Sequence, residues 1–216
     1  MTRVKICGLS ETEHALAAAK AGADFIGLVF APSPRQISPS QAQEIVAAIK
    51  EHHRETQMVG VFVNMPGPAV NRMAQACGLD WVQLSGDESW AYCQQIHLPI
   101  IKAVRVRPGE GAGELLEYLA SGEEILASQR RIYLLDTQVE GSYGGTGTGF
   151  DWEIAGAVAR KFPIIVAGGL TPENVSRLVR TVYPWGVDVS SGVEEGGVKS
   201  LARIKAFIDA VRKANG

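Results

Sequence analysis

The sequence predicts an α/β fold of the (β/α)8 TIM barrel type with a closed parallel sheet, and three observations support this. Short apolar runs rich in Val and Ile alternate with longer segments of helical periodicity. Strands joined by helical crossovers form parallel sheets, and eight such units in 216 residues match a compact closed barrel. The turn Cys7-Gly8-Leu9 lacks the glycine pattern of an open dinucleotide-binding sheet. We therefore expect a single domain over residues 1–216.

The eight apolar runs are the predicted strands. In chain order they cover residues 3–7, 25–30, 58–63, 81–84, 100–104, 132–135, 164–167 and 186–189. The segments between them have one apolar face at helical spacing, and a closing helix follows the last strand. Three helix starts are predicted from capping signals: Ser10 with Glu13, Ser38-Pro39, and Thr171-Pro172.

Composition and charge exclude several classes of protein. The net charge of -2 gives no electrostatic reason to expect nucleic acid or an anionic membrane as a partner. No apolar run approaches the length of a membrane span, and the first residues are typical of a strand rather than of a signal peptide. The three cysteines form no CxxC pair. We expect a cytoplasmic protein without disulfides.

The segments after the seventh and eighth predicted strands carry the strongest functional signal. Gly168 and Gly169 follow one strand, and Ser190, Ser191 and Gly192 follow the other. Glycines let a ligand approach the backbone, whose N–H groups suit a phosphate dianion. Glycine also serves tight turns, but this pair of loops is the recurrent phosphate site of such barrels. The pattern favours a small phosphorylated substrate.

Cys7 ends the first predicted strand, where barrel enzymes carry catalytic groups. Strand alternation puts Lys5 on the same face, so a pocket-facing Cys7 implies a lysine inside the barrel. A buried charge needs a partner, and Asp188 is the candidate because the eighth strand adjoins the first in a closed barrel. Cys7 is interpreted as a thiolate base or nucleophile, and the alternative is a small inert core residue.

Asp136 and Arg35 are two further candidates. Asp136 closes the sixth predicted strand at the catalytic rim, although Asp is also common as a helix cap or turn residue. Arg35 lies in a proline-stiffened loop, where it could bind a carboxylate bidentately or be a solvated loop arginine. No histidine closes a predicted strand, so acid–base chemistry is expected to use carboxylate, thiol or lysine. No cluster of His, Asp and Glu at the strand ends predicts a metal.

Taken together, these residues resemble the phosphoribosylanthranilate isomerase family of barrel enzymes. The resemblance rests on short motifs that run in order from the first strand to the last. Each motif is weak alone, but the ordered set is specific. The motifs are Val4–Leu9, Ser33–Ser38, Gly60–Asn64, Val82–Leu84, Leu134–Thr137, Gly144–Gly147, Phe150–Trp152, Ala167–Leu170 and Val187–Glu194.

The resemblance implies an Amadori rearrangement of N-(5-phosphoribosyl)anthranilate, a step of tryptophan biosynthesis that needs no external cofactor. It implies that Asp136 is the general acid, that Cys7 is the general base, and that Arg35 binds the anthranilate carboxylate. The expected phosphate and ribose contacts come from the last two loops and the eighth strand, namely from Gly168, Gly169, Asp188, Ser190, Ser191 and Gly192.

One position departs from the family pattern, and other functions stay open. The family usually carries His where this chain has Ser85, which puts any pocket role of that position in doubt. A Schiff-base aldolase acting through Lys5 or Lys102 is one alternative, and a non-catalytic sugar-phosphate binder is another. An apolar helix face has the same sequence pattern whether it packs on the barrel or on a second subunit, so the sequence is consistent with both a monomer and a homodimer.

Overall fold

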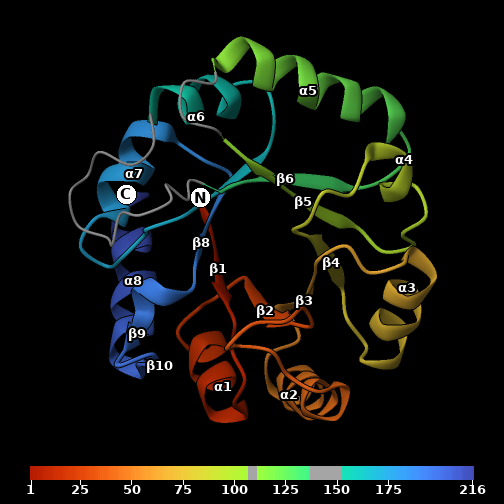
Figure 1. The fold of residues 1–216 in the computed structure, drawn as a ribbon. Coiled ribbons are helices and arrows are strands. Elements are labelled where there is room, and N and C mark those ends of the chain that lie inside the picture. The colour runs from red at the N-terminus through yellow and green to blue at the C-terminus, as the bar shows by residue number, and fades with distance from the viewer. Residues whose placement is uncertain (107–110, 137–151) are drawn as a thin grey trace.

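The computed structural model describes residues 1–106, 111–136 and 152–216, and a closed barrel of parallel strands lies at its centre (Figure 1). In these ranges the strands follow chain order around the barrel, and the eighth pairs with the first. The (β/α)8 prediction is confirmed. The barrel strands are β1 Arg3–Cys7, β2 Phe25–Val29, β3 Gln57–Phe62, β4 Trp81–Leu84, β5 Ile100–Arg105, β6 Arg131–Asp136, β7 Ile164–Ala167 and β8 Gly186–Val189.

Helices surround the barrel in the same rotational order as the strands (Figure 1). A 3-10 turn at Ser191–Val193 and a small antiparallel hairpin of β9 and β10 follow β8, and the sequence did not predict this hairpin. The helices are α1 Thr12–Lys20, α2 Pro39–His52, α3 Gly67–Ala76, α4 Trp90–Cys93, α5 Ala112–Ile125, α6 Trp152–Ala159, α7 Val175–Val182 and α8 Leu201–Ala214, and the hairpin strands are β9 Glu194–Glu195 and β10 Val198–Lys199. None of the helices in the described ranges is long and apolar enough to cross a membrane.

One of the three predicted helix starts is right. Helix α2 begins at Pro39 with a full capping box, in which Ser38 accepts from the Gln41 backbone and Gln41 binds the Ser38 backbone. The two other starts were wrong. Helix α1 begins at Thr12 with no side-chain cap bond, and α7 begins only at Val175.

The late start of α7 has a local cause. The side-chain oxygen of Asn174 accepts a hydrogen bond from the backbone N–H of Thr171, and its side-chain nitrogen donates to the carbonyl of Gly169. These bonds hold residues 171–174 in a turn, and the asparagine amide competes with the helical backbone for its partners. Pro172 therefore lies before the helix rather than at its first position.

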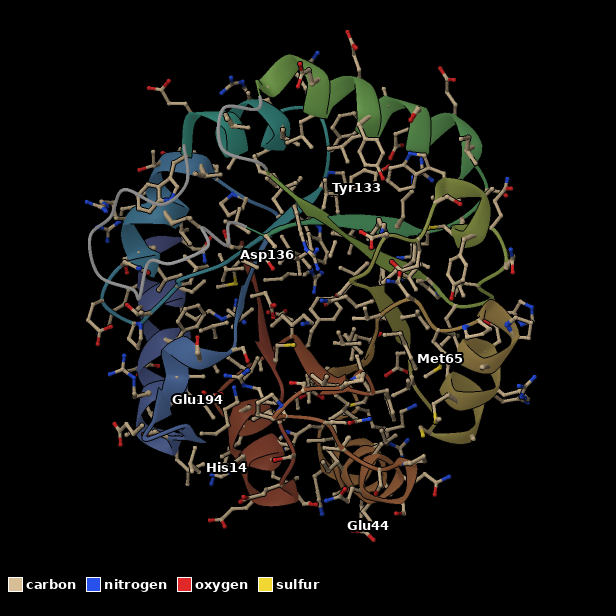
Figure 2. All side chains as sticks on the ribbon, in the orientation of Figure 1. His14, Glu44, Met65, Tyr133, Asp136 and Glu194 are labelled. Carbon is tan, nitrogen blue, oxygen red and sulfur yellow. The ribbon has the colours of Figure 1, made fainter. Side chains whose placement is uncertain are left out.

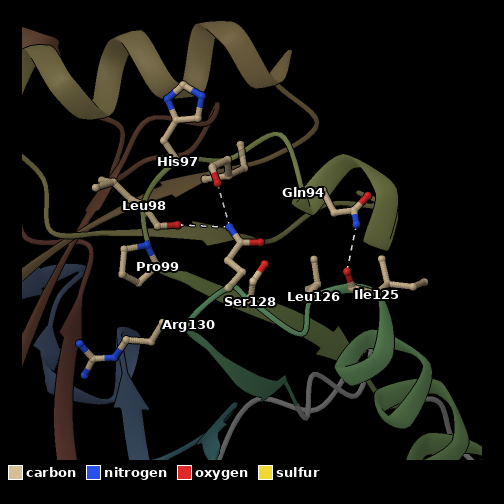
Figure 3. A pocket seen from close by; sticks show the side chains of 10 residues that line it. Gln94, His97, Leu98, Pro99, Ile125, Leu126, Ser128 and Arg130 are labelled. Carbon is tan, nitrogen blue, oxygen red and sulfur yellow. Dashed lines mark hydrogen bonds between the residues drawn. The ribbon is translucent and has the colours of Figure 1, made fainter.

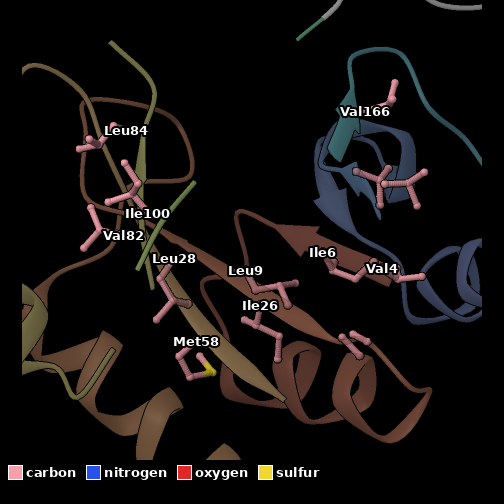
Figure 4. Packing of buried hydrophobic residues seen from close by; sticks show 14 of the residues in the cluster. Val4, Ile6, Leu9, Ile26, Leu28, Met58, Val82, Leu84, Ile100 and Val166 are labelled. Atoms are coloured by element: carbon pink, nitrogen blue, oxygen red, sulfur yellow. The ribbon is translucent and has the colours of Figure 1, made fainter. Parts of the chain in front are cut away.

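Strand alternation separates the core into two apolar layers. One layer fills the barrel interior and includes the fully buried Trp81, which meets Phe25 edge to face at 5.9 Å between ring centroids. The other layer lies between the sheet and the helices, and Figure 4 shows part of it around Ile6, Ile26 and Met58. Since Val4 and Ile6 pack outward in this second layer, the intervening residues of β1 point into the barrel.

A buried ion pair ties the loops after β3 and β4 to β5. The ammonium group of Lys102 lies 2.8 Å from a carboxylate oxygen of Glu88, and both side chains are almost fully buried. The same carboxylate accepts hydrogen bonds from the backbone N–H groups of Asn64 and Gly86, and Lys102 donates to the carbonyl of Gly86. The donors compensate the desolvation of the two charges, which is the condition for a buried pair to be tolerated.

We predict that Lys102→Met destabilises the protein by about 3–5 kcal/mol, because it leaves the Glu88 carboxylate buried without its counter-charge. The double variant Lys102→Met/Glu88→Gln should recover much of this loss, since the neutral amide oxygen still accepts from the backbone N–H groups. Urea unfolding followed by circular dichroism measures both values. Equal stability of Lys102→Met and the parent would show that the Glu88 carboxylate does not need Lys102 as its counter-charge.

Candidate active site

The predicted catalytic residues lie at one rim of the barrel, at the carboxyl ends of its strands. Cys7 is the last residue of β1 and Asp136 is the last residue of β6. Strands β7 and β8 separate them around the barrel. Figure 2 shows Asp136 near the middle of the barrel mouth. The rim thus presents a thiol and a carboxyl group from two sides of one space, which lets them reach different atoms of one ligand.

Cys7 lies beside a buried ion pair. Residues Lys5 and Asp188 are opposite each other in the β1–β8 register, and the Lys5 ammonium lies 2.9 Å from an Asp188 carboxylate oxygen. Lys5 is 1% exposed, and Asp188 and Cys7 are each 8% exposed. The predicted partnership of Lys5 with Asp188 is therefore confirmed. It places a charged pair inside the barrel directly below the Cys7 thiol.

Glycine at position 27 makes room for this group. A methyl group on Gly27, in the neighbouring strand β2, would lie 2.8 Å from the Cys7 sulfur and 3.0 Å from the Lys5 ammonium nitrogen. Both contacts are closer than van der Waals packing allows. The thiol and the ammonium group thus occupy the space that a side chain at position 27 would fill.

The surroundings of Cys7 push its pKa in opposite directions. Burial raises the pKa of the thiol above its ordinary value, and the negative charge of Asp188 adds to this. The positive charges of Lys5 and Lys199 lower the pKa, but the net shift is upward. Burial is the largest single influence on Lys5 and acts to lower its pKa, but the combined effects of Asp188 and Cys7 raise the pKa overall. Lys5 therefore stays protonated while Cys7 is mainly a thiol.

The two glycine-containing loops after β7 and β8 are in direct contact. A methyl group on Gly192 would lie 1.8 Å from the carbonyl oxygen of Leu170, so only glycine fits where the loops meet. Gly168 and Gly169 have φ angles of 88° and 62°, in the left-handed region that glycine adopts without strain. The predicted phosphate loops are thus adjacent, with Ser190 and Ser191 leading into the same turn.

Arg35 reaches the rim and binds a carboxylate of the protein itself. Its Nε and Nη2 atoms donate to the two carboxylate oxygens of Glu194, at 2.7 and 2.9 Å. The Lys199 ammonium lies 2.8 Å from the same carboxylate. The hydrogen bonds from Arg35, with the charge of Lys199, lower the pKa of Glu194 to about 2. Arg35 is therefore half-buried and held in an ion pair with Glu194, and is not a solvated loop residue.

Lys199 and Glu194 are functional-site neighbours that the sequence reasoning missed. Lys199 is buried and also donates to the backbone carbonyl and the hydroxyl of Ser190, at 2.9 and 3.2 Å. The Ser190 hydroxyl in turn donates to the Cys7 carbonyl at 3.1 Å. A signal was present, because paired glycines at 196–197 between two short polar segments indicate a two-residue hairpin. That hairpin folds Lys199 back onto Glu194.

Ser85 stands near the rim at the end of β4. Its hydroxyl accepts a hydrogen bond from the side-chain nitrogen of Gln83 at 3.0 Å, and Gln83 is itself buried. The side-chain oxygen of Gln83 has no hydrogen-bond partner within the described ranges. Ser85 therefore orients an amide of the barrel interior.

The surface pockets at the other end of the molecule are separate from this site. One pocket of about 480 Å³ lies before β5 and β6, among side chains that include His97, Gln129 and Arg130 (Figure 3). A second of about 790 Å³ lies over α3. Neither contains a predicted site residue. Among the residues described here, no three or more His, Cys, Asp or Glu side chains group closely enough to hold a metal ion.

Comparison with known proteins identifies the family and agrees with the fold. The family described as N-(5'-phosphoribosyl)anthranilate (PRA) isomerase matches residues 4–210. A protein named N-(5'-phosphoribosyl)anthranilate isomerase from Dehalococcoides mccartyi is 46% identical over 216 residues, which cover 100% of this chain and 98% of the relative. One of that name from Pseudomonas fluorescens is 48% identical, with 99% of this chain and 97% of the relative covered.

A solved structure gives the same result. The phosphoribosylanthranilate isomerase from Thermotoga maritima superposes with a TM-score of 0.85 at 38% identity, covering 99% of this chain and 100% of the other. That relative is described as dimeric, and monomers generated from it have also been crystallised. The match in sequence runs the length of the barrel and includes both rim loops. The chain therefore belongs to the N-(5'-phosphoribosyl)anthranilate isomerase family.

Proposed function

We propose that the chain catalyses the Amadori rearrangement of N-(5'-phosphoribosyl)anthranilate to 1-(2-carboxyphenylamino)-1-deoxyribulose 5-phosphate in tryptophan biosynthesis. The observation that carries the proposal is the shared rim of Cys7 and Asp136, which close two different strands beside the contacting loops after β7 and β8. Membership of the isomerase family supports the same reaction. The reaction moves protons within one substrate, so no atoms are added or lost overall.

Asp136 is proposed as the general acid. Its carboxyl group would donate a proton to the ring oxygen of the ribose as the bond between that oxygen and C1 breaks. The electron pair of the anilino nitrogen forms the C1–N double bond, which gives an open-chain iminium ion. The position of Asp136 at the barrel mouth, in line with the inward-facing Ile132 and Leu134 of β6, supports this role.

Cys7 is proposed as the general base. The iminium group makes the C2–H bond acidic, so a modest base such as a thiolate suffices to remove this proton. The electrons of the C–H bond form an enolamine, and tautomerisation of the enolamine gives the ketone product. The proton ends on the Cys7 sulfur, while the adjacent Lys5 keeps its own proton because Asp188 raises the pKa of Lys5. The protein thus supplies the acid and the base, and the substrate supplies the electron sink.

The remaining predicted residues are proposed to bind the two ends of the substrate. The backbone of Gly168, Gly169, Ser191 and Gly192, together with Ser190, would hold the phosphate, and Asp188 would lie near the ribose. Arg35 would bind the anthranilate carboxylate. Its bonds to Glu194 use Nε and Nη2, and among the described residues Nη1 makes no hydrogen bond. The substrate carboxylate can therefore bind at Nη1 without displacing Glu194.

The geometry disfavours the Schiff-base alternative. A lysine must be neutral to attack a carbonyl group. Lys5 and Lys102 are both buried in ion pairs, at 2.9 and 2.8 Å from their carboxylates, so either lysine would have to leave a buried carboxylate unpaired in order to react. We further propose that residues 1–216 act as one barrel domain in the cytoplasm, without a cofactor, as a monomer or a homodimer.

We predict that Cys7→Ala and Asp136→Ala each lower kcat by roughly 10²–10⁴-fold, because each removes one proton-transfer group. Turnover is followed as the loss of anthranilate-type fluorescence with freshly prepared phosphoribosylanthranilate. Cys77→Ala is the matched control, since Cys77 is a buried cysteine that lies after α3 and away from the rim. Turnover retained in both rim variants would reject the mechanism, and no turnover by the parent chain would reject the reaction.

We predict that Arg35→Met raises KM by roughly 10- to 100-fold with a smaller change in kcat, since a charge-assisted bond to the substrate contributes equally to ground and transition states. Arg3→Met is the control, because Arg3 lies at the opposite end of β1 and pairs with Asp24. Inhibition by a reduced product analogue with and without its carboxylate identifies the contact. If Arg35→Met weakens both analogues equally, Arg35 does not bind that carboxylate.

We predict that kcat/KM rises with pH across the neutral and mildly alkaline range. Only the thiolate accepts a proton, and burial holds the pKa of Cys7 above its ordinary value, so the active fraction increases as the pH approaches that pKa. The increase should reach up to about tenfold per pH unit on the acidic side. A profile that is flat from pH 6 to 9 in steady-state assays would contradict a thiol base.

A further inference from the structure

We propose that Lys5 stabilises the thiolate form of Cys7 and so acts as a positioning residue for proton abstraction. The inference rests on the proposed role of Cys7 as the base, and it assigns to the buried Lys5–Asp188 pair a task other than packing. Lys5 touches neither the substrate nor a reacting bond in this scheme. It acts through the sulfur atom of Cys7.

The first argument is geometric. Lys5 and Cys7 are inward-facing neighbours on β1, and both project into the space left open by Gly27 of β2. The ammonium nitrogen and the sulfur lie within 3.0 Å of the same point, the position that a methyl group on Gly27 would take. Since β1 is held on both sides by β2 and β8, the backbone keeps both side chains on the inward face of the strand.

The second argument concerns energy. Desolvation of a lysine and an aspartate inside a barrel is expensive, and apolar residues of similar volume often give equal or higher stability. The interior around Lys5 is otherwise built from apolar side chains such as Phe25, Val59 and Ile165. A charged pair at this place is therefore a poor way to fill the core. It does suit a site where a negative charge must form on an adjacent atom.

The third argument is the balance of charge around Cys7. The charged groups that face it are Lys5 from β1, Asp188 from β8, Lys199 from β10 and Arg35 from the loop after β2. Lys199 and Arg35 share the carboxylate of Glu194, which neutralises part of their effect. Of the four groups, Lys5 has the largest lowering effect on the Cys7 pKa. Asp188 opposes it but keeps Lys5 charged.

The proton inventory follows from this arrangement. When the thiolate forms in the free enzyme, the Cys7 proton leaves to solvent and Lys5 keeps its own. During the reaction the C2 proton of the substrate moves to the sulfur, and the thiolate charge beside Lys5 disappears. Lys5 thus has the same charge before and after the step. Its contribution is to increase the fraction of enzyme that is ready to accept the proton.

The test measures Cys7 ionisation directly. The rate of Cys7 alkylation by iodoacetamide is followed from pH 6 to 10.5, with the Cys7 peptide quantified by mass spectrometry so that Cys77 and Cys93 do not contribute. The parent is compared with Lys5→Met and with Lys5→Met/Asp188→Asn. We expect the midpoint of the alkylation profile to move up by about one pH unit or more in Lys5→Met, because the nearby positive charge is lost. In the double variant it should move up by less, because Asp188→Asn also removes a negative charge that opposes Lys5.

Two features of the design separate the alternatives. The double variant removes both buried charges, so it should fold even if Lys5→Met does not, and it shows whether a shift arises merely from an uncompensated Asp188. Lys102→Met/Glu88→Gln is the matched control, since it removes the other buried lysine pair at 2.8 Å and should leave the Cys7 midpoint unchanged. An unchanged midpoint in Lys5→Met/Asp188→Asn, or an equal shift in the control, would overturn the inference.

The same variants distinguish this inference from the proposed function. If Lys5 acts through a catalytic thiolate, the rise of kcat/KM with pH moves by the same amount as the alkylation midpoint. If the alkylation midpoint shifts while the kcat/KM profile does not, Lys5 tunes the thiol as proposed, but Cys7 is not the base. If neither profile shifts in the double variant, the role of Lys5 is rejected while Cys7 can still be tested by its own substitution.

Discussion

The site depends on the pairing of β1 with β8, which closes the barrel. This pairing sets Lys5 opposite Asp188, and their ion pair fixes the charged group beneath Cys7. The same closure brings the turn after β8 against the end of β1, where the Ser190 hydroxyl binds the Cys7 carbonyl. If the sheet were open, the two strands would lie at its edges and both charges would face water. The contact of the thiol with its neighbouring ion pair and with the turn after β8 is thus a consequence of one sheet closure.

The inward-facing residues differ in polarity from strand to strand of the barrel. In β1 the inward residues Lys5 and Cys7 are polar, whereas the inward residues of β7, Ile165 and Ala167, are apolar. The barrel interior therefore has a dry lower part around Trp81 and a charged upper part around Lys5. Charges next to a dry core interact more strongly than they would in water. The Cys7 thiol lies at this boundary, where burial disfavours the charged thiolate and the positive charge of Lys5 favours it.

Much of this organisation could be predicted from the sequence because it follows from short-range pattern. Cys7 and Asp136 could be placed at the ends of β1 and β6 because each directly closes an apolar run. The pairing of Lys5 with Asp188 follows from strand alternation and from the adjacency of the first and last strands in a closed barrel. Other features could not be predicted because they depend on competing local bonds or on tertiary contact. Asn174 delays the start of α7, and the pairing of Arg35 with Glu194 needs a loop after β2 to meet a hairpin after β8. Loop residues meet in space without any periodic signal in the chain.

The hydrogen bond between Lys5 and Asp188 joins residues 183 positions apart, and Lys199 approaches the site from still later in the chain. This separation has a consequence for synthesis of the protein. A growing chain carries Cys7 from the start of synthesis, yet for most of translation Asp188 and the turn after β8 that contacts this cysteine have not been made. Local helices and early strands can form meanwhile, because a chain begins to fold as it emerges. A chain that ends before Asp188 lacks both the partner of Lys5 and the turn after β8, so it can contain seven of the eight barrel strands and still leave Cys7 without these neighbours.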